Sequence, residues 1–568
     1  MSVESTSIKP KWQQICEAIQ EKQERLKKAV PEAWRVEADA SITNPRIYLE
    51  ADKVGHILSN DELAITKCDA VEILSEIHSG KVTSEFVTTA FCKRAAVAYA
   101  VTNPLCEIFF DEGIARAKEL DKYLKETGKV VGPLHGLPIS VKDHIDVQGK
   151  DTNMGLTAWY GNVAEQHAAS VKILYDAGAV LYCKTSMPQA GMANETVSPI
   201  HGTTKCAYST LLTSGGSSGG EGSLIGMFGS PMGVGTDIAG SIRSPASYNG
   251  IYGFKPSERR LPLLGERTTD SGNVGILVSL GPIARSLRGC ELFMRIILNA
   301  EPWNVDPSVL RMPWRFNEEK MPEKLTIGVV RWDHFVMPHP PISRALDIAV
   351  DTLRKAGHEV IEWEAKEHGL PSGDVILPLF YPNGARHVFD LIDGMGEPWI
   401  GPIRRGMKDN PVVQKLRESN QIEDYWNAVV ARDQFRVDYA QRWNDSAKLT
   451  ASGRKLDAII SPTATSVSFP HDFNRWSGYT HIWNLLDYPT SVVGVTHADS
   501  KVDTWDYQPD RNNERDVANW EIYKDPSLYD GCPVAISISG RTGEDEKTLK
   551  MTMMIDDLLK RAGHGLKK

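Results

Sequence analysis

The sequence lacks the features that mark membrane-spanning, secreted and zinc-binding proteins. Among its 568 residues no apolar run is long enough to cross a bilayer, and the start, MSVESTSIKPKW, has no signal-peptide core. The eight cysteines are scattered without CxxC or CxxH spacing, which argues against a disulfide framework or a zinc cluster. We therefore expect free thiols in a reducing compartment and a cytoplasmic protein.

Motifs for bound metals, nucleotides and nucleic acids are also missing. There is no HExxH, and the fifteen histidines show no metal-ligand spacing. GxxxxGK(S/T) and GxGxxG are absent, so the chain has neither a phosphate-binding P-loop nor a dinucleotide fingerprint. The formal net charge of −9 disfavours nucleic acid, whose phosphates attract a basic surface. We expect no metal, no other cofactor and no nucleic-acid partner.

The chain does contain an alternation of strands and helices. Its 41% hydrophobic and 24% charged residues are typical of a globular protein. A buried-looking strand over residues 137–143 is followed by a helix over 170–177 and a strand over 179–184. Later strands and helices are expected over 325–330, 343–356, 359–362, 456–461, 491–495, 534–539 and 544–561. The sequence therefore predicts an α/β fold, a single large domain with a mixed β-sheet core surrounded by helices.

Two segments depart from this alternation. The amphipathic pattern over residues 12–34 predicts a helix that packs on the protein rather than on a membrane, because its polar face mixes both charge signs. Residues 371–455 are rich in aromatics and proline, with a helix over 422–443, and are typical of a helical insertion near a substrate pocket. We expect an N-terminal helical segment over 1–60 packed on a main domain over 61–568.

A glycine-rich stretch over residues 214–245 stands out. Ten of the residues from Ser214 to Gly240 are glycine, yet apolar residues are spread through the run, which indicates a buried segment rather than a linker. The GGSSG at 215–219 matches GxSxG in letters. A nucleophile elbow needs a strand before the serine and a helix after it. Here Thr213 and Ser214, rather than an apolar strand, lead into the motif, and more glycine follows it. The match is therefore interpreted as accidental.

Since no histidine is clearly placed to serve a serine nucleophile, a lysine becomes the candidate base. Lys142 lies in a predicted strand, where Asp143 points to the opposite face and is not expected to pair with it. Burial would have to lower the lysine pKa from about 10.4 toward 7, at a cost of roughly 4 to 5 kcal/mol. Taken alone, Lys142 is better interpreted as an ordinary surface lysine at a strand end than as a base. The interpretation as a base gains support only when the serine motif is considered with it.

Together these stretches resemble the amidase signature family. Lys142 closes a GLPISVK strand, GGSSGG fills residues 215–220, and GTDIAGSIR fills 235–243, with 24 residues from Ser217 to Ser241. The resemblance covers about residues 63–559. VMPHPP at 336–341 and IWNLLDYP at 482–489 are most similar to the fungal acetamidase-type branch.

The resemblance implies a Ser–Ser–Lys triad. Ser241 would attack the amide carbonyl, and Ser217, after a cis peptide, would pass its proton to neutral Lys142. The implied oxyanion hole consists of the backbone N–H groups of Ile238, Ala239, Gly240 and Ser241. Ala239 stands where the family usually has glycine, and would strain the loop by roughly 1 kcal/mol if that position needed a positive φ.

The family pattern also suggests supporting and pocket residues. Asp237 and Arg243 would brace the loop, and Ser218 would fix Lys142 and Ser217. Met192 and Ala193 would contact the acyl group, although core packing is an equally good interpretation of Met192. Four aromatics could wall the pocket but are expected to be core residues, namely Phe380, Tyr381, Trp426 and Trp483.

The predicted activity is hydrolysis of a carboxylic amide C–N bond through an acyl-enzyme, with a small-molecule amide as the partner. Three alternatives stay open: the catalytic subunit of a glutamine-dependent tRNA amidotransferase, an acyltransferase that uses the same acyl-enzyme, and a non-catalytic amide-binding relative. The identity of the acyl group is not predicted. The family likeness leaves a homodimer open.

Overall fold

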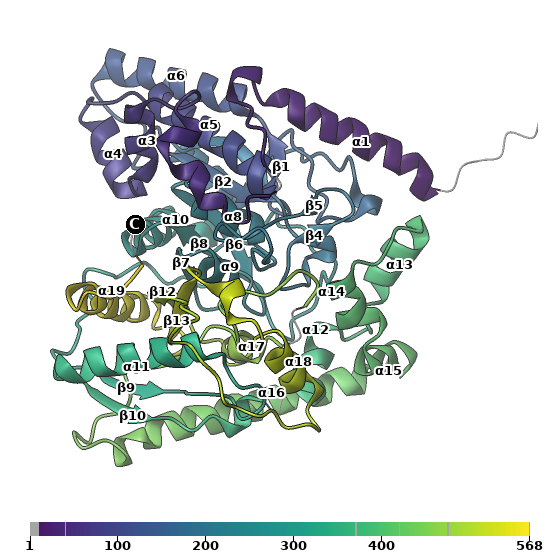
Figure 1. The fold of residues 1–568 in the computed structure, drawn as a ribbon, viewed down its shortest axis with the longest axis vertical. Coiled ribbons are helices and arrows are strands. Elements are labelled where there is room, and N and C mark those ends of the chain that lie inside the picture. Colours follow the sequence, from purple (N-terminus) through teal and green to yellow (C-terminus); the bar gives the residue numbers. More distant parts are fainter. Residues whose placement is uncertain (1–10, 40, 370–371, 420, 474–475, 567–568) are drawn as a thin grey trace, which may run out of the picture.

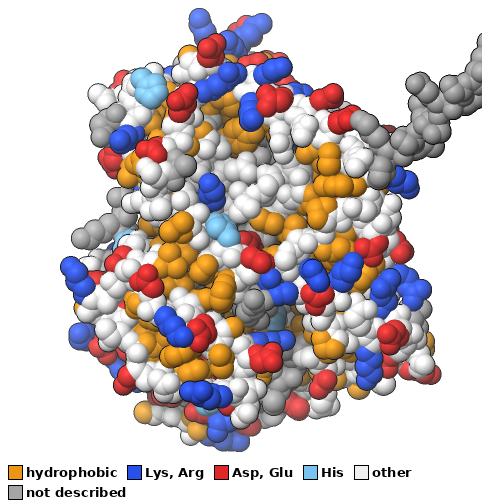
Figure 2. Space-filling model, turned by 45° about the vertical axis from the view of Figure 1, so that its right-hand side comes forward, with side chains coloured by type: hydrophobic (Ala, Val, Ile, Leu, Met, Phe, Trp, Pro, Cys, Tyr) orange, Lys and Arg blue, Asp and Glu red, His pale blue; other side chains and the backbone are white. Residues whose placement is uncertain are grey.

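The computed structural model describes residues 11–39, 41–369, 372–419, 421–473 and 476–566 (Figure 1). The predictions for the first ten residues, and for residues 371 and 420 of the predicted insertion, lie outside these ranges. Within the described ranges, no helix is both long and apolar enough to cross a bilayer. On the face shown in Figure 2, acidic and basic side chains are interspersed.

An eleven-stranded mixed sheet runs through the molecule, in the order β1-β3-β2-β6-β8-β7-β12-β13-β11-β9-β10. β2 pairs in parallel with β3 and β6, whereas β6 and β8 are antiparallel. The strands are β1 (Leu105–Ile108), β2 (Pro138–Lys142), β3 (Val180–Thr185), β6 (Met232–Asp237), β7 (Tyr252–Lys255), β8 (Ser279–Ala284), β9 (Thr326–Val329), β10 (Glu359–Glu362), β11 (Ala458–Pro462), β12 (Thr490–His497) and β13 (Pro533–Ser539), with β4 (Val197–Ser198) and β5 (Gly202–Thr203) forming a separate pair. The predicted α/β class with a mixed sheet is confirmed.

Helices surround this sheet. In Figure 1 the N-terminal helices α3 to α6 lie at one end of the molecule, and α11 and α16 lie at the opposite end beside β9 and β10. The α-helices are α1 (Lys11–Ala29), α2 (Ala51–Val54), α3 (Asn60–Lys67), α4 (Ala70–His78), α5 (Ser84–Thr102), α6 (Phe110–Thr127), α7 (Ala169–Asp176), α8 (Gly219–Gly226), α9 (Arg243–Tyr248), α10 (Leu287–Asn299), α11 (Pro340–Lys355), α12 (Leu377–Phe380), α13 (Arg386–Met395), α14 (Gly401–Ile403), α15 (Pro411–Ser419), α16 (Ile422–Asp445), α17 (Gly478–Leu485), α18 (Glu514–Glu521) and α19 (Asp545–Arg561).

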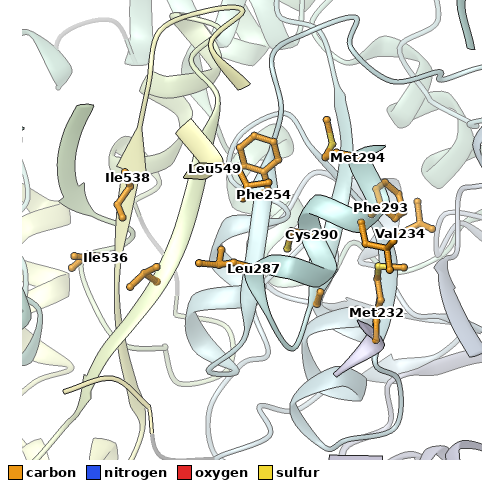
Figure 3. Close-up of a cluster of buried hydrophobic side chains, with 14 of the residues drawn as sticks. Met232, Val234, Phe254, Leu287, Cys290, Phe293, Met294, Ile536, Ile538 and Leu549 are labelled. Atoms are coloured by element: carbon orange, nitrogen blue, oxygen red, sulfur yellow. The ribbon is translucent and has the colours of Figure 1, made fainter. Parts of the chain in front are cut away.

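The main core joins the two ends of the sequence. Helix α10 presents a stripe of buried residues three or four apart, which is the spacing of one helix face. Figure 3 shows this stripe in one cluster with side chains of β6, β7, β13 and α19. The labelled members are Met232, Val234, Phe254, Leu287, Cys290, Phe293, Met294, Ile536, Ile538 and Leu549. Because β6 carries site residues, this cluster fixes the sheet on which the site is built.

The N-terminal helix ends earlier than the sequence pattern predicts. α1 stops at Ala29, and residues 32–34 form a separate 3₁₀ turn. Pro31 explains the break, since proline has no N–H to donate to the preceding turn. Lys22 of α1 is buried and forms salt bridges with Glu107 at 2.7 Å and Asp151 at 2.8 Å. The division into segments 1–60 and 61–568 stays a prediction.

Candidate active site

Two parallel strands bring the predicted lysine to the glycine-rich segment. β2 and β6 are neighbours, with Val141 opposite Val234, so the carboxyl ends of both strands lie at the same edge of the sheet. Lys142 is the last residue of β2, and Thr236 lies near the end of β6. Open α/β sheets bind ligands at this edge, because polar groups and helix starts collect there.

Lys142 is fully buried and contacts a predicted serine. Its Nζ lies 2.7 Å from Ser217 Oγ and 2.9 Å from Thr236 Oγ1. It forms no salt bridge with any residue that the structure describes, Asp143 included. Burial lowers the pKa of Lys142 to about 7, although nearby carboxylates, Glu266 foremost, oppose this shift. A lysine in this environment is partly neutral near pH 7 and able to accept a proton.

The glycine-rich run is buried, as predicted, from Leu212 to Asp237. The Gly216–Ser217 peptide bond is cis. The reason given against a nucleophile elbow holds only in part, because α8 does start at Gly219 despite its glycines. No strand of the described sheets leads directly into Ser217, since β5 ends at Thr203. Gly216 is required for space, since an added Cβ would lie 2.3 Å from Ala193 O.

Ser217 and Ser241 open into the same cavity of about 230 Å³, which also exposes Thr236 and Met192. Their segments are linked where the Ser218 N–H donates to Ser241 O at 3.1 Å. Ser218 Oγ contacts the backbone of Thr236, donating to its carbonyl at 3.3 Å. No hydrogen bond from Ser218 to Lys142 or Ser217 is found among the described residues, so the prediction that Ser218 fixes these two side chains has no direct contact behind it.

Asp237 and Arg243 form a buried ion pair beneath the loop that carries Ser241. Arg243 Nη2 donates to Asp237 Oδ1 at 2.8 Å and its Nε to Oδ2 at 3.0 Å, with both side chains fully buried. The same carboxylate accepts the N–H groups of Gly240 at 2.8 Å and Ile242 at 3.1 Å. Burial disfavours the charged carboxylate, but the Arg243 charge outweighs it and holds the pKa of Asp237 well below its usual range. The pair fixes the backbone of the loop.

Helix α17 holds the loop from the other side. Arg243 Nη1 donates to Thr480 O at 2.9 Å, and Asn484 Nδ2 donates to Asp237 Oδ1 at 3.0 Å. Thr480 Oγ1 donates to Ala239 O at 2.6 Å. The loop is thus tied to residues far away in the sequence.

The substitution of glycine by Ala239 causes no backbone strain. Ala239 is not among the residues with positive φ, whereas Gly240 has φ +120° and an added Cβ there would lie 2.5 Å from Thr480 Oγ1. Gly240 departs from the oxyanion-hole prediction, because its N–H is already donated to Asp237. For the amides of Ile238, Ala239 and Ser241, no acceptor is found in the described part of the chain.

A second cavity of about 200 Å³ meets the first at Ser241. Met192 lines both cavities, whereas Ala193 lines only this one. Phe380 and Tyr381 also line it, although both are more than nine-tenths buried, so they serve as core and wall together. Trp483 is fully buried.

Trp426 contradicts the expectation of a core aromatic. It lies on α16 and is 59% exposed. The long helix α16 turns only part of its circumference toward the core, and Trp426 falls on the opposite face with the other exposed apolar residues Ile422, Val430 and Val437.

Comparison with known proteins identifies the family. The family model described as Amidase matches residues 86–549. The chain belongs to the amidase family. This confirms the resemblance to the amidase signature family and the prediction of an amidase-type enzyme.

Fungal amidases match the chain over nearly its full length. Amidase FG08078 of Gibberella zeae is 39% identical, covering 97% of this chain and 99% of its own length. An acetamidase of Aspergillus oryzae is 38% identical over 95% of this chain and 98% of its own. Among solved structures, a fatty acid amide hydrolase superimposes with a TM-score of 0.85 at 32% identity, covering 96% and 95% of the two chains. The acetamidase-like character predicted from residues 336–341 and 482–489 is confirmed.

Two site residues of this amidase were missed from the sequence. Thr236 stood inside the recognised GTDIAGSIR segment without a role, and it contacts Lys142 directly. His144 lies in the turn directly after β2, two positions after Lys142, and its Nε2 lies 2.9 Å from Thr236 Oγ1. Its closeness to Lys142 in the sequence was the available signal. Among the described residues, no group of three or more His, Cys, Asp or Glu side chains is arranged to hold a metal ion.

Proposed function

We propose that this amidase hydrolyses a carboxylic amide to a carboxylate and ammonia or an amine, using Lys142, Ser217 and Ser241 and no cofactor. The observation that carries the proposal is the 2.7 Å contact between Lys142 Nζ and Ser217 Oγ, in a buried site that opens to a cavity shared with Ser241. A neutral lysine, a bridging hydroxyl and a second hydroxyl form a proton path that ends at a nucleophile.

In the first half-reaction Ser241 Oγ attacks the carbonyl carbon. Its proton moves to Ser217, whose own proton moves to Lys142 Nζ. The oxyanion faces the free amides of Ile238 and Ala239 and that of Ser241 itself. The C–N bond then breaks as the proton returns through Ser217 to the leaving nitrogen. In the second half-reaction water attacks the ester by the same proton path and releases the acid.

The linings of the two cavities support a proposal for where each half of the substrate binds. Ser217 lines only the 230 Å³ cavity, and it must protonate the leaving nitrogen, so the amine occupies that side. The acyl group then occupies the 200 Å³ cavity, against Ala193, Phe380 and Tyr381. Drug-sized ligands need roughly 300–1,000 Å³, so this cavity favours a short aliphatic or single-ring acyl group.

Hydrolysis is better supported than the amidotransferase alternative. The fungal relatives that match almost the whole chain are named amidase and acetamidase, and both halves of the site come from this chain. Acyl transfer to another nucleophile would use the same acyl-enzyme, and no feature of the described cavities favours it over water.

The test is ammonia release by purified protein from acetamide, benzamide, indole-3-acetamide and a long-chain primary amide, beside Ser241→Ala. We expect turnover of the smaller amides and its loss in the variant. Release that survives Ser241→Ala would contradict the proposed nucleophile. A protein that hydrolyses only the long-chain amide would contradict the assignment of the acyl cavity.

A further inference from the structure

A network of buried hydrogen bonds continues beyond Lys142, along the wall of the cavity that Ser217 and Ser241 share. Lys142 Nζ contacts Thr236 Oγ1 at 2.9 Å, and the same hydroxyl contacts His144 Nε2 at 2.9 Å. The other ring nitrogen, His144 Nδ1, lies 3.0 Å from the carbonyl oxygen of Arg267 and 3.3 Å from a Glu266 carboxylate oxygen. The His144 side chain is 6% exposed and that of Glu266 is 7% exposed. The triad by itself does not require this arrangement.

The carbonyl of Arg267 determines which atom donates in each hydrogen bond from His144 through Thr236 to Lys142. A carbonyl oxygen only accepts, so His144 Nδ1 carries the hydrogen. Burial and the nearby Lys142 charge lower the pKa of His144 well below its ordinary value, so the ring is neutral and Nε2 is an acceptor. The Thr236 hydroxyl therefore donates to His144. It turns a lone pair, not its hydrogen, toward Lys142.

This direction matters for a lysine that acts as a base. A neutral amine has two N–H donors and one lone pair. Thr236 takes up one N–H, and the lone pair is left for the Ser217 hydroxyl at 2.7 Å. If Thr236 lost its acceptor, its hydroxyl could rotate and donate to the same lone pair. It would then compete with the proton of Ser217.

We propose that His144 is a positioning residue that acts through Thr236 to aim the lone pair of Lys142 at Ser217. This inference rests on the proposed function, in which Lys142 accepts the proton. Glu266 and the Arg267 carbonyl hold the ring, and burial is the main cause that keeps it neutral, with the Lys184 charge, and the Lys142 charge whenever that lysine is protonated, acting in the same direction. His144 also lines the 230 Å³ cavity, but in the proposed role it acts on the proton path through Thr236 and not on the substrate.

The test compares His144→Leu, which removes the acceptor, with His144→Gln, whose side-chain oxygen keeps one. Each is combined with Thr236→Val, which removes the competing hydroxyl. With Thr236 present, we expect His144→Leu to lower kcat about tenfold, the worth of one hydrogen bond, and His144→Gln to stay within about threefold. With Val at 236, His144→Leu should cost less than about twofold, because there is no hydroxyl left to compete.

The labelling rate of Ser241 by a fluorophosphonate ester gives a readout that needs no amide substrate. The serine oxygen bonds to phosphorus and fluoride leaves, so the rate reports how well Ser241 is deprotonated. A wild-type protein that is not labelled at Ser241 would count against the proposed function itself. A labelled wild type with equal labelling of His144→Leu would overturn only the role of His144.

The pH profile separates positioning from simple structural support. Glu266, Asp237, Glu221 and Asp143 are the carboxylates that act on Lys142, and all remain in the variants. We therefore expect His144→Leu to lower the plateau of kcat/KM and leave its acid limb in place. A loosened, wetter site would move the limb toward higher pH instead. Such a shift would overturn the inference. So would a double variant whose loss of kcat equals the product of the losses in His144→Leu and Thr236→Val.

Discussion

The two sides of the proposed substrate site are built in different ways. The chemical side comes from β2, α8, β6 and the Ser241 loop, where Lys142, Asp237 and Arg243 have no exposure and are held by several hydrogen bonds each. The acyl side is formed in part by the acyl-side segment, residues 372–419 and 421–445, which contributes apolar side chains such as Phe380 to the cavity, while its long helix α16 leaves apolar residues exposed. The first side therefore tolerates little change, and the second should tolerate change on the exposed face of α16.

The largest effect is expected at the lysine. Lys142→Ala should lower kcat by about 10⁴-fold, because Ser217 loses its proton acceptor. Lys142→Arg keeps a positive charge and similar length but cannot give up its proton near neutral pH, so we expect it to be as inactive. Steady-state kinetics on the best amide measures both. Activity of Lys142→Arg within tenfold of wild type would show that charge, not basicity, is required.

The next largest effect is expected from removing a buried ion pair, with the removal of an exposed ion pair as its matched control. Arg243→Ala leaves the Asp237 charge buried and unpaired, and should lower the free energy of unfolding by about 3 to 5 kcal/mol. Arg405 pairs with Asp472 at 2.7 Å in the acyl-side segment, but the two side chains are 27% and 64% exposed, so Arg405→Ala should cost less than about 1 kcal/mol. Urea denaturation gives both values. Equal losses would remove the contrast between the two regions.

The pH dependence should come from the chemical side alone. Lys142 works only when neutral, so kcat/KM should be full above a pKa of about 7 and fall about tenfold per unit below it. The Glu266 carboxylate raises the pKa of Lys142, so Glu266→Gln should move this acid limb to lower pH. An acyl-side variant should leave the limb unmoved. If the acid limb moved in Phe380→Ala but not in Glu266→Gln, its assignment to Lys142 would be contradicted.

The smallest effects are expected in the acyl-side segment. Phe380→Ala enlarges the 200 Å³ cavity and should lower kcat/KM for acetamide about tenfold, while raising the relative rate on amides with a larger acyl group. Trp426→Ala, on the exposed face of α16, should change neither by more than about twofold. Rates across the amide panel test both. A specificity change in Trp426→Ala would place the acyl site elsewhere.

The segments of the chemical side could be recognised from the sequence because each has a marked local pattern. Ser217 and Ser241 stand 24 positions apart in one recognisable stretch, and the strand that ends at Lys142 is marked by its apolar run. Buried strands such as β3 and β13 were also found within one residue at either end. The pattern of neighbouring residues was sufficient to predict those elements whose structure depends mainly on neighbouring residues.

What the sequence could not give depends on contacts between distant segments. Thr480 and Asn484 brace a loop about 240 positions earlier, and no local pattern relates them to it. The exposure of Trp426 follows from how α16 is rotated against the core, which its weak amphipathic pattern does not determine. The amide of Gly240 was assigned to the oxyanion by likeness, whereas the Asp237 carboxylate takes it.

The tie between α17 and the Ser241 loop has a consequence for synthesis of the chain. A ribosome makes Ser241 long before it makes Thr480 and Asn484, so the nucleophile emerges while its brace is still untranslated. Closing a loop of this length also comes late, because its entropy is lost before the contacts form. The enzyme should therefore stay inactive on the ribosome until the last sixth of the polypeptide appears. An incomplete product that ends before α17 would carry Lys142, Ser217 and Ser241, the three residues of the proposed triad, and should still hydrolyse nothing.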